Sequence, residues 1–142
     1  MTGSKNSAKS SQRDSRETIS IRNTTRQGMP QRVPFLALKD AALGASYDLS
    51  LVFVGPTRSR ALNRTHRGNN KPANILSFPL SKTSGEIFID LTTARKQAPD
   101  FDRSYTNFIA FLFIHGLFHL KGFDHSAIME RNERAIRKAF AI

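Results

Sequence analysis

Three of the four histidines in this 142-residue sequence lie in one short segment, HGLFHLKGFDH, at residues 115–125. His115 and His119 are four residues apart, so on a helix their rings project from the same face at neighbouring turns. Gly122 can adopt the left-handed conformation that ends a helix, and the resulting turn can bring His125 to the same place. Three imidazoles around one Zn²⁺ leave a fourth position for water, which is typical of catalytic zinc sites.

The alternative is that His115 and His119 are ordinary core residues and that His125 only caps the helix. Burying an unsatisfied polar group costs about 1–3 kcal/mol, whereas one metal ion satisfies three ring nitrogens. The sequence contains no cysteine, so a metal would be held by His, Asp or Glu. We therefore predict one Zn²⁺ per chain, or another transition metal that histidine binds. Asp124 could orient a ligand, act on the water or lie exposed in the turn.

The same histidine spacing occurs in the metzincin proteases, which makes proteolysis a rival chemistry. Those enzymes place a glutamate general base directly after the first histidine. Here that position is Gly116, which has no side chain to accept a proton. The spacing therefore favours a similar metal scaffold with a different reaction.

The periodicity of apolar residues predicts the elements that would position these histidines. The predicted strands are residues 18–23, 47–55, 74–80 and 85–91, the last two forming a hairpin. The predicted helices are residues 32–45 (ending at Gly44), 57–68 (capped by Thr57, ending at Gly68), 104–122, and 126–142 (capped by Ser126). We predict an α/β (α+β) fold, zincin-like, in which a small mixed sheet of about four strands packs on a central histidine-bearing helix.

Composition bounds the organisation of the chain. Eleven phenylalanines and 39% apolar residues suffice for the core of one domain, which we predict over residues 18–142. Residues 1–17 contain almost no apolar side chain, so we predict a disordered basic tail. The sequence has no apolar run long enough to span a membrane, and no apolar segment follows the basic N-terminus as in a signal peptide. We therefore expect no membrane partner and a cytoplasmic location.

The charge of the chain indicates a polyanionic partner. Twenty-two Lys and Arg residues against eleven acids give a net charge of +11, which favours nucleic acid over the alternatives of membrane anions or simple solubility. One stretch of the sequence has five bases and no acid: Arg58, Arg60, Arg64, Arg67 and Lys71. Such a stretch can contact several phosphates and predicts an RNA groove, although a solvated helix face would have the same composition.

Together these segments resemble the YbeY endoribonucleases, a family of ribosomal RNA maturation factors. The family signature His-Gly-x-Leu-His-Leu-x-Gly-Tyr-Asp-His is similar to HGLFHLKGFDH, and LNRTHRGNNKPANILSFPL and GEIFID resemble its upstream motifs. The resemblance covers residues 62–125, with departures at His66, Ala73 and Phe111, and the C-terminal region is shorter than usual. It implies a metal-dependent endoribonuclease that acts on single-stranded ribosomal RNA or its precursors, especially at the small-subunit 3′ end.

The resemblance also implies roles for single residues. Arg67 falls on the arginine of the family motif, where a guanidinium can clamp the scissile phosphate. The resemblance also allows a substrate contact from Ser77, which otherwise packs in the cleft wall. Arg64 and Lys71 are candidate RNA contacts because they belong to the basic stretch. Ribosomal proteins or a GTPase are partner candidates. The competing class is a non-catalytic, metal-containing factor that binds RNA or the ribosome during assembly.

Overall fold

The computed structural model describes residues 18–122, 124 and 126–142. The predicted basic tail, residues 1–17, lies outside these residues, and so does His125. Among the helices that are described, none is both long and apolar enough to cross a membrane.

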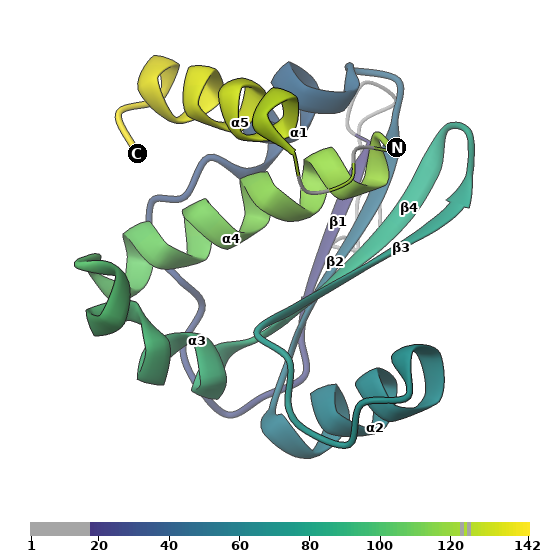
Figure 1. Cartoon of the computed structure of the whole chain (residues 1–142), viewed down its shortest axis with the longest axis vertical. Helices are drawn as coiled ribbons and strands as arrows, with labels where there is room; N and C mark the ends of the chain where they lie inside the picture. The colour runs from purple at the N-terminus through teal and green to yellow at the C-terminus, as the bar shows by residue number, and fades with distance from the viewer. Residues whose placement is uncertain (1–17, 123, 125) are drawn as a thin grey trace, which may run out of the picture.

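Four strands form one mixed sheet in the spatial order β1-β2-β4-β3 (Figure 1). The strands are β1 (Ile19–Asn23), β2 (Asp48–Val54), β3 (Ile75–Ser81) and β4 (Ser84–Asp90). Strands β1, β2 and β4 run parallel, and β3 pairs antiparallel with β4 as the predicted hairpin. In β2, Leu51 and Phe53 are buried on one face and Val52 and Val54 on the other, so both faces of the sheet need cover.

Helices supply that cover. Those in the described residues are α1 (Phe35–Leu43), α2 (Pro56–Arg67), α3 (Leu91–Gln97), α4 (Tyr105–Leu120) and α5 (Ala127–Ala139), with a 3₁₀ helix, η1 (Ala98–Phe101), after α3. Helix α4 crosses one face of the sheet, and α1 and α5 pack against α4 (Figure 1). Helix α2 covers the opposite face, where Leu62 packs with Val52 and Phe88. The predicted mixed sheet on a central histidine-bearing helix is thus confirmed, and its zincin-like character stays a prediction.

Helix α4 lies close to the sheet at Gly116. A Cβ atom at this position would lie 2.7 Å from Ile75 Cδ1 and 2.9 Å from Ser77 Oγ, both on β3. Side chains do not tolerate such short contacts, so the absence of a side chain allows the helix backbone to lie directly on the strand. The Ser77 hydroxyl donates a hydrogen bond to the Gly116 carbonyl oxygen at 3.2 Å, which ties the two elements together.

Local signals in the sequence located most helix ends correctly. Ser126 caps α5, because its hydroxyl accepts a hydrogen bond from the Met129 backbone N–H at 3.1 Å. Gly122 follows α4 with a φ of +99°, the left-handed conformation expected of a residue that reverses the chain. Helix α2 ends at Gly68, as predicted.

Two local predictions were wrong. Thr57 does not cap α2: the N-cap lies two residues earlier, at Gly55, and Pro56 is in the first turn, where its missing N–H is no loss. The predicted strand at residues 85–91 ends at Asp90, whose carboxylate accepts a hydrogen bond from the Thr93 backbone N–H at 3.0 Å and so caps α3. The sequence prediction missed α3, although an aspartate followed by helix-forming residues and Pro99 is the pattern of a short capped helix.

The fit at Gly116 generates a stability prediction. Gly116→Ala should lower the free energy of unfolding by about 1–3 kcal/mol, because the added methyl group must displace Ile75 and Ser77. Urea denaturation followed by circular dichroism measures the change. Gly28→Ala is the matched control, since a Cβ there meets nothing within 4 Å. Equal stability of the two variants would contradict the proposed close packing.

Candidate active site

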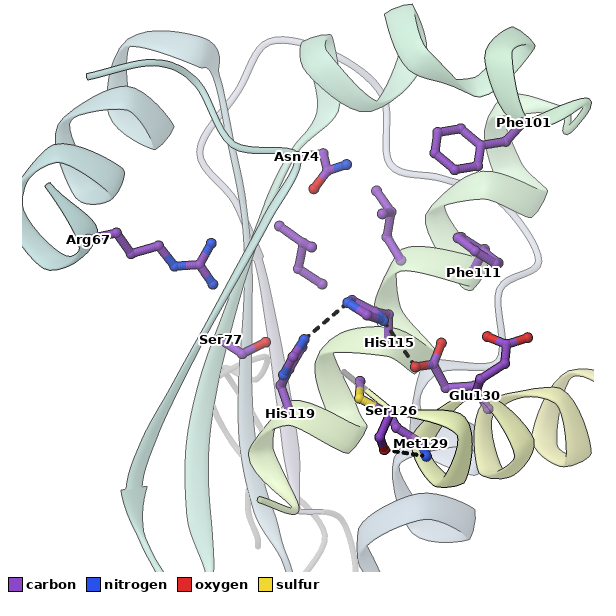
Figure 2. A pocket seen from close by; sticks show the side chains of 13 residues that line it. Arg67, Asn74, Ser77, Phe101, Phe111, His115, His119, Ser126, Met129 and Glu130 are labelled. Atoms are coloured by element: carbon purple, nitrogen blue, oxygen red, sulfur yellow. Dashed lines mark hydrogen bonds and ion pairs between the residues drawn. The ribbon is translucent and has the colours of Figure 1, made fainter. Parts of the chain in front are cut away.

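His115 and His119 lie one turn apart on α4 and face the same space, as the sequence predicts (Figure 2). Their Nε2 atoms are 3.0 Å apart, and their ring planes are nearly perpendicular, at 89°. Each side chain is only partly buried, although most of α4 around them is fully buried. The two rings therefore present nitrogen atoms at an accessible place on an otherwise apolar helix.

A residue that the sequence prediction missed holds the first histidine in place. Glu133 of α5 contacts His115, with its Oε2 atom 3.0 Å from the His115 Nδ1 atom (Figure 2). The Glu133 side chain is only 4% exposed. A carboxylate accepts a hydrogen bond, so this contact places a proton on Nδ1 and leaves the lone pair on Nε2 when the ring is neutral. Nε2 is then the atom that can bind a metal.

Glu133 is itself paired with a second residue of α5. The Arg137 Nη1 atom lies 3.7 Å from Glu133 Oε1, and Arg137 Nη2 lies 3.3 Å from Glu130 Oε1. A buried carboxylate is costly unless it is paired, and here both a histidine and an arginine accompany it. The spacing of Met129, Glu133 and Ile136 on the inward face of α5 could have revealed Glu133, because it is a carboxylate on an otherwise apolar stripe.

The histidines line a cleft of about 400 Å³ that also contains Arg67 and Ser77. Figure 2 shows the Arg67 side chain directed from the end of α2 toward the histidines, with Ser77 between them on β3. The cleft is lined by Arg67, Asn74, Ile75, Ser77, Phe101, Phe111, Leu112, His115, His119, Ser126, Met129, Glu130 and Glu133. A cation, two imidazoles and a hydroxyl from distant parts of the sequence thus share one cavity.

The position of Arg67 depends on how α2 is attached to the rest of the fold. The buried Asp90 carboxylate accepts a hydrogen bond from the Ser59 hydroxyl at 2.6 Å, which joins α2 to the end of β4. Asn63 of α2 donates a side-chain hydrogen bond to the carbonyl oxygen of Lys71 at 2.9 Å. This bond holds the loop that follows the helix against α2. These bonds attach α2 to β4 and to the loop that follows it, and Arg67 extends from the last turn of this helix.

The model of one known family, described as endoribonuclease YbeY, matches residues 11–141 of this sequence. The chain belongs to this family. The match includes His115 and His119 of α4 and Arg67 at the end of α2, which the fold brings together in the cleft.

Individual relatives agree with the family assignment. An endoribonuclease YbeY from Alkaliphilus oremlandii is 35% identical over 108 residues, which cover 66% of this chain and 72% of the relative. One from Pelotomaculum thermopropionicum is 32% identical over 115 residues, covering 73% and 76%. The solution structure of TM1509 from Thermotoga maritima covers 87% of this chain and 89% of its own, with a TM-score of 0.62 and 20% identity. This last similarity shows that the two proteins share a fold.

The remaining residues predicted for the YbeY-type site lie elsewhere or outside the described part of the chain. Arg64 and Lys71 are exposed, and neither lines the cleft. Asp124 is exposed. His125 is outside the described residues, and within residues 18–122, 124 and 126–142 no three His, Asp or Glu side chains form a ligand set. The metal site, including His125 as its third ligand, therefore stays a prediction.

Proposed function

We propose that this chain is a metal-dependent endoribonuclease that cuts single-stranded regions of ribosomal RNA or its precursors, including the 3′ end of small-subunit RNA. Membership of the YbeY family supports the reaction class. The observation that carries the proposal is the shared cleft, in which Arg67 faces His115 and His119 across Ser77. The proposal assigns the protein to the cytoplasm, with the small ribosomal subunit, ribosomal proteins or a GTPase as partners.

His115, His119 and His125 would hold one Zn²⁺, or another transition metal. The two described histidines fit such an ion, because Zn–N bonds measure about 2.0–2.1 Å and nitrogens 3.0 Å apart can reach the same ion. The contact between Glu133 and His115 Nδ1 also fits, since metal-binding histidines commonly donate their other N–H to a carboxylate. A bound ion would supply Lewis-acid chemistry, which polarises a phosphate oxygen or activates water.

The other side of the cleft would hold the RNA backbone. The guanidinium of Arg67 can form two parallel hydrogen bonds to a phosphate and offset the negative charge that develops as the phosphorus is attacked. Arg64 and Lys71 lie outside the cleft, so we assign them to phosphates of neighbouring nucleotides. Ser77 already donates to Gly116, so any contact with substrate would use its hydroxyl oxygen as an acceptor.

Proteolysis is not favoured by the packing of α4. A glutamate base at position 116 would need space that Ile75 and Ser77 occupy. The side chains in the cleft are instead suited to a phosphodiester, because a cation faces the candidate metal ligands.

The first test of the proposal is chelator-sensitive cleavage. The purified chain should contain close to one transition metal by elemental analysis and should cut an RNA with an accessible single-stranded region. His119→Ala should lose both the metal and the cleavage, because it removes a ligand one turn from His115, while circular dichroism shows a folded chain. RNA binding without any chelator-sensitive cleavage would instead indicate the non-catalytic assembly factor, and full metal content in His119→Ala would contradict the assigned ligands.

Glu133 provides a second test that is specific to this structure. Glu133→Gln should weaken zinc binding by about 10- to 100-fold, measured by competition with a chromophoric chelator, because the amide orients His115 less strongly. Glu130→Gln is the matched control: Glu130 is on the same helix and also pairs with Arg137, but its side chain is 51% exposed. If both variants bound zinc equally well, Glu133 would have no role in holding the metal.

Substituting Arg67 distinguishes a role in cleaving the phosphodiester from a general electrostatic attraction to RNA. Arg67→Ala should keep the metal and most of the RNA affinity but cleave saturated RNA about 10²-fold more slowly, the scale of losing one charge-stabilising donor. Lys71→Ala should mainly weaken binding and reduce its salt dependence by about one phosphate. Single-turnover kinetics at saturating RNA compare the two. Equal losses of rate would remove the catalytic role of Arg67.

A further inference from the structure

One end of the cleft is aromatic, and the function proposed above does not use it. Phe101 and Phe111 both line the cavity, and Phe111 precedes His115 by one turn on the same face of α4. Figure 2 shows the two rings at the end of the cavity away from Arg67, beyond His115. A group bound on these rings would therefore lie in the same cavity as the two histidines.

Phe101 is unusually exposed for a phenylalanine. It is 50% accessible, and its ring lies on the fully buried Phe108 ring, with centroids 4.8 Å apart and planes inclined at 31°. Phe111 supports both rings, with its centroid 5.9 Å from each. Phe101 thus rests on the buried Phe108 ring, and half of its surface is left exposed to solvent.

The backbone holds Phe101 in this position. Phe101 ends η1, where the Asp102 N–H donates to the Pro99 carbonyl oxygen at 3.1 Å and the Arg103 N–H donates to the Ala98 carbonyl oxygen at 3.2 Å. An apolar ring that is kept half exposed on an ordered turn loses little conformational freedom when it binds a planar group.

Charges around the rings favour a flat group attached to a polyanion. The guanidinium carbon of Arg103 lies 4.3 Å from the Phe111 ring centroid and that of Arg137 lies 5.2 Å from it. Burial, and then the charge of Arg137, lowers the pKa of Arg103, but arginine stays protonated at neutral pH. At the end of η1, Asp100 and Asp102 flank Phe101 in the sequence, and their negative charges disfavour a phosphate group directly on the Phe101 ring.

We propose that Phe101 and Phe111 form a base-stacking subsite, in which an unpaired nucleobase of the RNA lies on the exposed face of Phe101. The proposal rests on the RNA substrate proposed above and adds a reason for single-strand preference, since a paired base is already stacked within a duplex. Bases of any identity have an aromatic face, so this subsite selects for an unpaired nucleotide and not for a sequence.

Three variants of the full chain test the subsite. Phe101→Ala should weaken binding of a short single-stranded RNA about tenfold, within the range for losing one base–aromatic stack, whereas Phe101→Trp should retain the affinity. Leu80→Ala is the control, because Leu80 is also an exposed apolar side chain, at 65%, but lies on β3 outside the cleft. Fluorescence anisotropy gives the affinities, with a gel to show that the RNA is intact.

Abasic substitutions in the RNA identify the stacked nucleotide. At one position, removing the base should weaken binding to the wild-type chain about as much as Phe101→Ala does, and the two changes together should add little. Wild-type affinity in Phe101→Ala, the same loss in Leu80→Ala, or full additivity at every abasic position would overturn the subsite. Stacking without cleavage would leave the subsite standing and refute the proposed reaction, and an absence of RNA binding would refute both.

Discussion

The contact between α4 and β3 at Gly116 determines where the candidate active site lies. Successive residues of a helix are rotated by about 100°, so His119 and His115 lie on the flank of α4 next to the stripe that faces the sheet. Because Gly116 lets α4 rest directly on β3, the flank of α4 that carries the two histidines lies beside β3 and is not covered by it. The same contact uses Ser77 to fix the helix, which makes Ser77 part of the cleft wall.

Helix α5 makes this arrangement chemically specific. Its apolar residues pack on α4, and the packing carries the Glu133 carboxylate into contact with His115. An ionised carboxylate at this depth costs several kcal/mol unless polar partners compensate it, and the partners are His115 on one side and Arg137 on the other. The pairing therefore links the packing of α5 to the orientation of the imidazole whose Nε2 atom faces the cleft.

The sequence predicted the parts of this structure that depend on local chemistry. Gly122, Ser126 and the alternation of apolar residues in the strands act through neighbouring residues, so they could be interpreted without a fold. Glu133 is different: the apolar stripe of α5 marks it as a candidate for burial, but its contact with His115 depends on how α5 packs on α4. Phe101 depends equally on tertiary structure, since the sequence does not show that η1 ends at the cavity that the histidines line. The predicted N-cap at Thr57 was wrong for a local reason, because Pro56 already provides a favourable first turn of α2.

The cleft combines residues from elements on opposite faces of the sheet. The histidines come from α4, whereas Arg67 comes from α2, which packs on the other face against Val52 and Phe88. Its guanidinium must therefore extend past the edge strand β3, and a long side chain is needed to reach the cleft. Asp90 bonds the start of α3 and Ser59 of α2 to the end of β4, so it helps to position the helix that carries Arg67, although Asp90 itself does not line the cleft. A phosphate in that site would meet Arg67 on one wall and the imidazoles on the other, while Arg137 partly compensates the Glu133 charge behind them.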